Sequence, residues 1–159
     1  MKSQEFRGLS GLLALYSTRM LGLFMVLPVL TLYLDQYRGS TTLLMGVALG
    51  VYGLTQGLLQ IPLGLLSDKI GRKSVIVGGM LVFLLGSLIA ASADSIYGLI
   101  LGRALQGAGA IASTVMALLS DLTTEESRTK AMAAVGGSIG LSFAVAMILG
   151  PILASAWGL

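Results

Sequence analysis

Five long apolar runs constrain the fold of this chain more than any other feature of its sequence. Each is at least 20 residues long, and they cover residues 9–34, 43–66, 74–93, 96–119 and 131–157. At about 1.5 Å per residue, an α-helix of that length crosses roughly 30 Å of hydrocarbon. Because lipid cannot satisfy backbone hydrogen bonds, helices are favoured over open strands. We therefore predict an all-α membrane protein with five transmembrane helices.

The composition is that of a membrane protein and leaves few kinds of catalysis open. Hydrophobic residues make up 55% of the chain and charged residues 11%, against about 25% charged residues in soluble domains. The chain has no cysteine and no histidine, which excludes disulfides, thiolate nucleophiles and proton transfer by imidazole. The net charge of +3 is small and requires no nucleic-acid partner. No residue pattern is typical of an enzyme, a metal site or a cofactor site.

Basic residues are unevenly distributed between the two sets of loops. The loops on the side that holds the N-terminus contain Lys2, Arg7, Lys69, Arg72, Lys73, Arg128 and Lys130. The loops on the other side contain Arg38. Because loops rich in Lys and Arg stay in the cytoplasm, we predict that the N-terminus is cytoplasmic, with residues 1–8 as a polar leader.

Two arginines, Arg19 and Arg103, lie inside apolar runs. A central arginine costs at least about 2.5–3.5 kcal/mol on insertion scales, so such residues are usually functional. Snorkelling of the long side chain toward the nearer headgroups is the alternative explanation. Gln106 follows Arg103 by one helical turn, which favours a polar interior over lipid. The residues that we expect to line a water-accessible cleft are Arg19, Tyr52, Gln56, Gln60, Gln106 and Ser142.

Prolines and glycines inside the runs predict bends and close packing. Pro28, Pro62 and Pro151 each remove a backbone hydrogen bond within a span, and Gly150 precedes Pro151, where we expect the fifth span to be broken. Glycine pairs spaced four apart, which allow neighbouring helices to approach, occur at 46/50, 53/57, 98/102 and 136/140. These pairs indicate a helix bundle and do not indicate a function.

Two further patterns lack the structural context that would give them a function. GAGAIA, residues 107–112, fits the form of a dinucleotide fingerprint but lies in mid-span with no strand before it. Asp121, Glu125 and Glu126 are clustered acids, but they share a charged loop, residues 120–130, with basic residues. Solvated surface charge explains them best.

The stretch GLLSDKIGRK, residues 64–73, is a densely charged turn between two of the spans. It resembles the signature of the loop between helices two and three of the major facilitator superfamily. RMLGLFMVLPVL (19–30), RALQGAGA (103–110) and ILGPILAS (148–155) resemble its other N-terminal signatures, in the same order. The last resembles the antiporter signature, with Ala154 and Ser155 in place of its final glycines. Across its length the chain is similar to the N-terminal part of the drug:proton antiporters of this family.

The resemblance implies roles for particular residues. It assigns Asp68, Arg72 and Asp121 to a charge cluster that gates the conformational change, with Gly64 and Gly71 forming the loop. It assigns Arg103 to proton coupling and the Gly150–Pro151 pair to a bend. The implied function is proton-coupled export of small organic or drug-like compounds from the bacterial inner membrane, with the bilayer, a small-molecule substrate and the proton as partners.

The length of the chain does not match that of a complete transporter of the family. Such transporters have two six-helix halves, whereas this chain has five predicted spans within 159 residues. We therefore expect residues 9–159 to be a truncated N-terminal domain whose partner is the missing C-terminal half or a full-length transporter. The alternative is a non-transporting membrane protein that interacts with other transporters.

Overall fold

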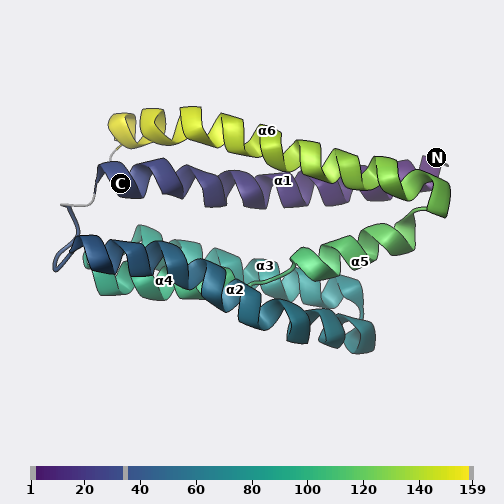
Figure 1. Cartoon of the computed structure of the whole chain (residues 1–159), viewed down its shortest axis with the longest axis horizontal. Coiled ribbons are helices and arrows are strands. Elements are labelled where there is room, and N and C mark those ends of the chain that lie inside the picture. The colour runs from purple at the N-terminus through teal and green to yellow at the C-terminus, as the bar shows by residue number, and fades with distance from the viewer. Residues whose placement is uncertain (1–2, 34–35, 158–159) are drawn as a thin grey trace. The chain divides into compact units, whose positions relative to one another are not determined.

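The computed structural model describes residues 3–33 and 36–157, and within these residues it contains six helices and no strand (Figure 1). The helices are α1 (Ser3–Leu32), α2 (Thr42–Ile70), α3 (Arg72–Ala91), α4 (Ile96–Ala108), α5 (Ala112–Leu122) and α6 (Glu125–Trp157). Five stretches of the described chain are long and apolar enough to cross a membrane, with α4 and α5 together forming the fourth. The predicted all-α membrane fold with five spans is confirmed.

The helices fall into two compact units. Unit 1 contains residues 1–32 and 116–159, and unit 2 contains residues 33–115. Unit 1 is therefore built mainly from α1 and α6, and unit 2 from α2, α3 and α4. The chain passes between them in the linker after α1 and within α5.

Side-chain caps and a backbone bridge define the helix starts in unit 2. Thr41 accepts a hydrogen bond from the Leu44 N–H at 3.1 Å, and Ser95 accepts one from the Gly98 N–H at 3.3 Å. Such caps satisfy N–H groups that have no partner within the helix. Arg38 joins the two starts, because its N–H donates to the Asp94 carbonyl at 3.0 Å and its carbonyl accepts from Ile96 at 3.2 Å.

Glycines allow α4 to approach both of its neighbours in unit 2. A Cβ atom at Gly102 would lie 2.7 Å from the carbonyl oxygen of Gly86 on α3, and one at Gly107 would lie 2.3 Å from the carbonyl oxygen of Tyr52 on α2. Real Cβ atoms do not come this close to backbone atoms, so only glycine fits at these positions. Apolar side chains from α3 and α4, including Ile76 and Leu99, fill the remaining core.

The fourth span is interrupted at residues 109–111, where the sequence predicted one continuous helix over 96–119. At this interruption a Cβ on Gly109 would lie 2.4 Å from the carbonyl oxygen of Gly79 on α3. The Ile111 side chain in turn occupies the space where a Cβ on Gly79 would lie, at 2.3 Å. The break therefore coincides with the closest packing between α3 and the fourth span.

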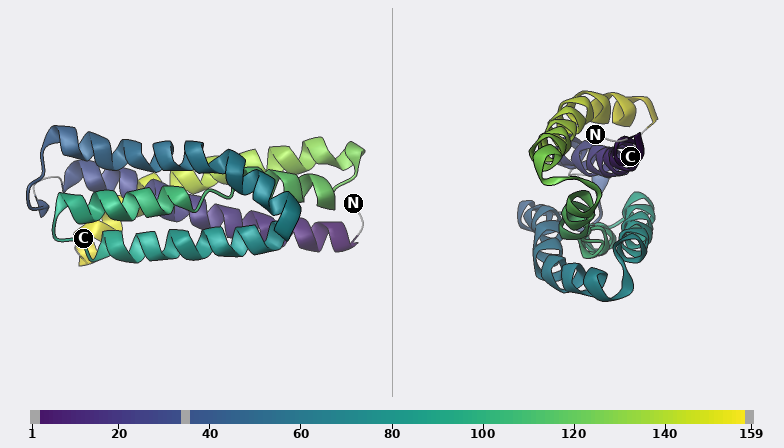
Figure 2. Two further views of the ribbon diagram at one scale, coloured as in Figure 1. Left: turned by 90° about the horizontal axis from the view of Figure 1, so that it is seen from below. Right: turned by 90° about the vertical axis from the view of Figure 1, so that its right-hand side faces the viewer.

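In unit 1, α1 and α6 pack against each other and run in the same direction (Figures 1 and 2). Phe24 and Phe143 pack edge to face, with ring centroids 5.2 Å apart and an interplanar angle of 86°. This geometry is favoured by the charge distribution of aromatic rings. Gly150 is the close point between the helices, since a Cβ there would lie 2.9 Å from the Met25 carbonyl oxygen.

Several predicted loops and breaks are helical in the structure. The leader is part of α1 from Ser3 onward, while residues 1–2 lie outside the described residues. The charged stretch 64–73 is helical except at Gly71, and the loop predicted over 120–130 shortens to residues 123–124. Helix α6 continues through Pro151, so the expected break at Gly150–Pro151 was wrong. Polar side chains can extend a helix beyond the membrane because helix formation does not require apolar residues.

The three prolines lie inside α1, α2 and α6. The second half of α2, which contains Pro62, turns away from the direction of its first half (Figure 2). Proline removes one N–H donor and crowds the preceding turn, which is the usual cause of such bends.

Candidate functional site

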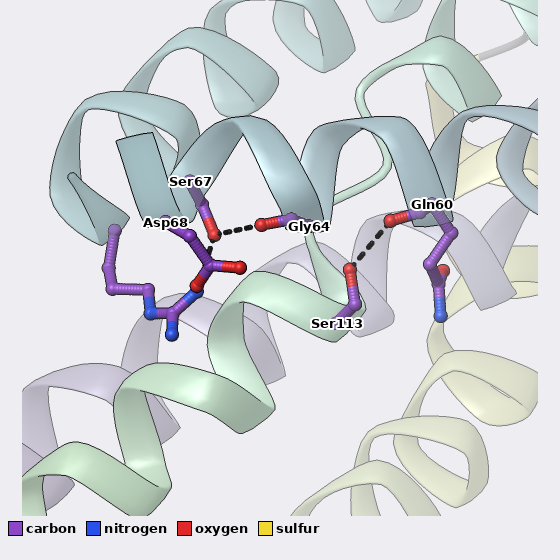
Figure 3. Close-up of polar contacts among 6 residues, drawn as sticks. Gln60, Gly64, Ser67, Asp68 and Ser113 are labelled. Atoms are coloured by element: carbon purple, nitrogen blue, oxygen red, sulfur yellow. Dashed lines mark hydrogen bonds and ion pairs between the residues drawn. The ribbon is translucent and has the colours of Figure 1, made fainter. Parts of the chain in front are cut away.

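The turn between α2 and α3 places an ion pair beside a buried serine. Asp68 on α2 and Arg72 at the start of α3 form a salt bridge. Arg72 Nη1 also donates to Ser67 Oγ at 2.7 Å, and Ser67 Oγ donates to the Gly64 carbonyl at 2.6 Å (Figure 3). Ser67 is 1% exposed, whereas the Asp68 side chain is 54% exposed. Arg72 thus contacts a buried hydroxyl and a solvent-facing carboxylate.

Two glycines of the stretch 64–73 are required for different structural reasons. Gly71 has φ of +97°, a conformation that side chains with a Cβ rarely adopt, and it allows α3 to start directly after α2. A Cβ on Gly64 would lie 3.0 Å from Ser113 Oγ. That hydroxyl donates to the Gln60 carbonyl at 2.8 Å and ties the second half of α2 to α5 (Figure 3).

Asp121, the predicted third member of the charge cluster, is exposed on α5. It belongs to unit 1, whereas Asp68 and Arg72 belong to unit 2. The structure brings Asp68 and Arg72 together, and the inclusion of Asp121 stays a prediction.

Arg103 lies at the centre of a buried polar network in unit 2. Its side chain is 2% exposed. Nη1 donates to Gln106 Oε1 at 2.8 Å, and the guanidinium carbon lies 4.8 Å from the centre of the Tyr52 ring. Gln106, which the sequence predicted on the same face as Arg103, and Tyr52, a cleft candidate from another span, both contact it. The guanidinium of Arg103 thus makes its contacts inside the bundle.

Ser87 on α3 completes this network and was not predicted. Gln106 Nε2 donates to Ser87 Oγ at 2.9 Å, and Ser87 Oγ donates to the Phe83 carbonyl at 2.8 Å. The run 74–93 contains no charged residue, so no residue in it was predicted to belong to a site. Ser87 is one of three serines in this run, and serines in membrane helices commonly bond to their own backbone, so the sequence did not distinguish it.

The other cleft candidates of unit 2 lie on α2. Gln56 is half-buried, and its Oε1 is buried and accepts no hydrogen bond from any described residue. Gln60 is also half-buried, and it contributes its backbone carbonyl to the contact with Ser113. Thr55, which was not predicted, donates to the Ala104 carbonyl at 3.0 Å and links α2 to α4.

The remaining candidates, Arg19 and Ser142, belong to unit 1. Arg19 is 1% exposed on α1, and its place in a water-accessible cleft stays a prediction. Ser142 is also buried, and its Oγ donates to the Ser17 carbonyl on α1 at 3.2 Å. Ser142 therefore joins two helices, and its hydroxyl is engaged in packing.

The glycine-rich segment 107–112 has a structural explanation. Gly107 and Gly109 bring the backbone of the fourth span against α2 and α3, and the segment is not preceded by a strand. The nucleotide-binding interpretation lacks its required strand, turn and helix.

Comparison with known proteins identifies the family. Residues 12–159 match the sequence profile of the Major Facilitator Superfamily. The chain belongs to this superfamily of membrane transport proteins. It is 62% identical over 155 residues to the inner membrane transport protein YajR of Escherichia coli, a match that covers 98% of this chain and 34% of YajR.

Two further relatives show the range of the similarity. An uncharacterized transporter of Buchnera aphidicola from Schizaphis graminum is 49% identical over 140 residues, covering 88% of this chain and 36% of that protein. A class H tetracycline resistance protein of Pasteurella multocida is 31% identical over 141 residues, covering 87% of this chain and 34% of that protein. The chain spans about a third of the length of these relatives. The similarity to YajR and the five spans make it a multi-pass protein of the inner membrane.

Proposed function

We propose that this chain supplies the N-terminal helices of a proton-coupled exporter of small organic compounds. The observation that carries the proposal is the buried guanidinium of Arg103, held inside the membrane span by Gln106 and Tyr52. A charge kept at this depth is costly, and in transport proteins such residues mark ion or substrate pathways. The similarity to a tetracycline resistance protein favours export of drug-like compounds.

Arg103 acts in this proposal through its fixed positive charge. An arginine guanidinium keeps its proton under physiological conditions, so it does not itself release or accept the transported proton. Its charge instead changes the affinity of nearby groups for protons or for an anion. Gln106 and Ser87 hold the guanidinium in one orientation, which keeps this effect constant during transport.

The ion pair at the turn after α2 is the proposed gate. Asp68 remains largely exposed while paired with Arg72, so its second oxygen stays available to a group outside this turn. A carboxylate that contacts a helix N-terminus or a cation is stabilised by about 0.3–1 kcal/mol or more. We propose that Asp68, Arg72 and Asp121 form a latch on the cytoplasmic side that stabilises one transport state. The missing partner of this latch would belong to a C-terminal half.

Flux measurements test the transport proposal. The complete product of the gene is reconstituted in proteoliposomes, and uptake of fluorescent drug-like compounds is followed after a pH gradient is imposed. We expect flux that requires the gradient, and we expect Arg103→Ala to abolish it. Arg38→Ala, which changes a loop arginine, is the matched control. Gradient-driven flux retained by Arg103→Ala would contradict the assignment, and an absence of flux together with binding to other transporters would favour the interaction-protein alternative.

The absence of cysteine makes the proposed orientation directly testable. A cysteine introduced at Lys69 is expected to resist a membrane-impermeant maleimide in intact spheroplasts, because the turn after α2 faces the cytoplasm. A cysteine introduced at Gln36, in the linker before α2, is expected to react. The reverse pattern of labelling would overturn the cytoplasmic assignment of the N-terminus.

A further inference from the structure

The charge of Arg103 is not neutralised by any acidic residue of the membrane spans. The five apolar runs contain no Asp and no Glu, although two of them contain an arginine. Buried charges in proteins are normally paired, because an isolated charge in a medium of low polarity loses several kcal/mol of hydration free energy. The five apolar runs therefore contain arginine but no acidic residue.

The neighbours of Arg103 in the structure compensate its charge only in part. Gln106 offers a neutral amide oxygen at 2.8 Å, and Tyr52 offers the face of its ring at 4.8 Å. A ring face is worth about 0.5–2 kcal/mol to a cation, less than a carboxylate in the same position. The network fixes the guanidinium in place and leaves its net charge intact.

The hydrogen bond to Gln106 uses one side of the guanidinium and leaves the other side for a ligand. Gln106 binds Nη1, while the Nε–H, on the opposite edge, is buried and makes no hydrogen bond to any described residue. The edge that contains Nε and Nη2 has two parallel N–H groups, which match the two oxygens of a carboxylate. The edge with the best geometry for a carboxylate is thus the edge to which no described residue makes a hydrogen bond.

Ser87 fixes the orientation of the Gln106 amide group. Because Gln106 Nε2 donates to Ser87 Oγ, the amide oxygen of Gln106 must face Arg103. A reversed amide would place two donors against each other and leave Ser87 without its donor. Gln106 therefore occupies Nη1 in a fixed manner and cannot rotate to cover Nε.

We propose that the Nε edge of Arg103 binds the carboxylate of an organic anion, so that the substrates of this transporter are carboxylate-bearing compounds. This inference rests on the proposed transport function and narrows its substrate class. Tyr52, beside the guanidinium, favours a substrate with an apolar or aromatic body next to the carboxylate.

Three probes of matched shape test the inference. Binding of 3-phenylpropanoate, 3-phenylpropanamide and 3-phenylpropylamine to the complete gene product in lipid nanodiscs is measured by calorimetry at pH 7. A charge-assisted pair of hydrogen bonds predicts that the carboxylate binds about tenfold or more tightly than the amide. The amine, which carries a positive charge, is expected to bind least.

Substitutions connect the preference to Arg103. Arg103→Gln is expected to abolish the preference for the carboxylate, and Arg103→Lys, which keeps the charge without the fork, to retain only part of it. Arg38→Gln is the matched control and should bind all three probes like the parent. Circular dichroism verifies that each variant is folded. If Arg103→Gln does not fold, the binding of the three probes to Arg103→Lys is the test. Equal binding of the three probes, or a preference that survives Arg103→Gln, would overturn the inference.

The outcome for substrate class is distinguishable from the outcome for transport. If the carboxylate binds through Arg103 but a pH gradient drives no flux, the anion site stands and the proposed transport function fails. If a gradient drives flux of neutral or cationic compounds and no carboxylate preference is found, transport stands and the anion site fails.

Discussion

The two units of this protein pack membrane helices in different ways. In unit 2, glycines bring backbone against backbone, as at Gly102 with Gly86 and at Gly107 with Tyr52. In unit 1, α1 and α6 meet largely through side chains such as Phe24 and Phe143, with one close backbone approach at Gly150. Unit 2 also holds a buried polar network in which Arg103, Gln106 and Ser87 are joined by hydrogen bonds.

Glycines of similar sequence pattern have different roles in the two units. Gly136, Gly137 and Gly140 on α6 have no atom within 4 Å of the position that a Cβ would take. The same holds for the pairs 46/50 and 53/57 on α2. Of the four predicted pairs, only 98/102 includes a glycine that meets another helix. Spacing alone therefore does not identify a glycine at a helix–helix contact, because the contact also requires a neighbouring helix close to that glycine.

Glycine substitutions are expected to give the largest contrast between the units. Gly107→Ala should destabilise the protein by about 3 kcal/mol, because the new methyl group would overlap the Tyr52 carbonyl and force α2 and α4 apart. Gly137→Ala should stabilise α6 by up to about 1 kcal/mol, since alanine is the better helix former and meets no atom. Unfolding of both variants by sodium dodecyl sulfate, followed by circular dichroism, measures the difference. Equal changes in the two variants would mean that the close approach in unit 2 contributes nothing.

Serine substitutions should give the next largest effect. Ser87→Ala leaves Gln106 Nε2 without its acceptor inside the bundle, which is expected to cost about 1–3 kcal/mol. Ser142→Ala removes a bond to a helical carbonyl on α1 and should cost about 0.5–1.5 kcal/mol. The same unfolding experiment compares them. A larger loss for Ser142→Ala would show that unit 1 depends more on its interhelical hydrogen bond than unit 2 does on its network.

Substitution of Asp68 separates stability from gating. Its side chain is largely exposed, so Asp68→Ala should lower the unfolding free energy by no more than about 1 kcal/mol. If Asp68 stabilises one transport state, the same change should reduce flux by about 5-fold to 150-fold, the range that coupling free energies of 1–3 kcal/mol produce. Lys69→Ala is the control in the same turn. Normal flux in Asp68→Ala would refute the latch, because this variant lacks the ion pair.

The smallest expected effect is on the pH dependence of the unfolding free energy, through Tyr37 of unit 2. Burial raises the pKa of the Tyr37 phenol above its ordinary value of about 10. The folded protein therefore favours the neutral phenol, and this contribution to stability is complete below about pH 10 and is lost as the pH rises further. Tyr37→Phe should reduce the loss of stability between pH 9 and 11 by a small, measurable amount. Identical pH profiles of the parent and the variant would show that this burial does not affect folding.

Much of the fold was predictable from the sequence because membrane insertion depends on local composition. Runs of apolar residues are recognisable without knowledge of their neighbours, and Arg103 with Gln106 was found because both lie on one face of one helix. The helix ends were less predictable. Charged residues at 64–73 and 120–130 continue the helices beyond the apolar runs, since polarity ends a span but does not end a helix.

Other parts of the site depended on contacts between segments far apart in the chain. Ser87 and Gln106 are 19 residues apart, and Thr55 and Ala104 are 49 apart. Ser67, whose buried hydroxyl accepts a hydrogen bond from Arg72, lies next to charged residues in the sequence. From its neighbours in the chain alone, it would be predicted to be exposed. No periodicity within one segment indicates which partner a hydroxyl will meet.

From the sequence alone we could predict five membrane spans, basic residues gathered in one set of loops, and a polar interior around Arg103. These properties follow from transfer free energies, which are summed along the chain one residue at a time. The tertiary structure decided which glycines allow close contact, where the fourth span is interrupted, and that Ser87 fixes the amide of Gln106 beside Arg103. These properties depend on the distance between atoms of different helices, and packing sets that distance.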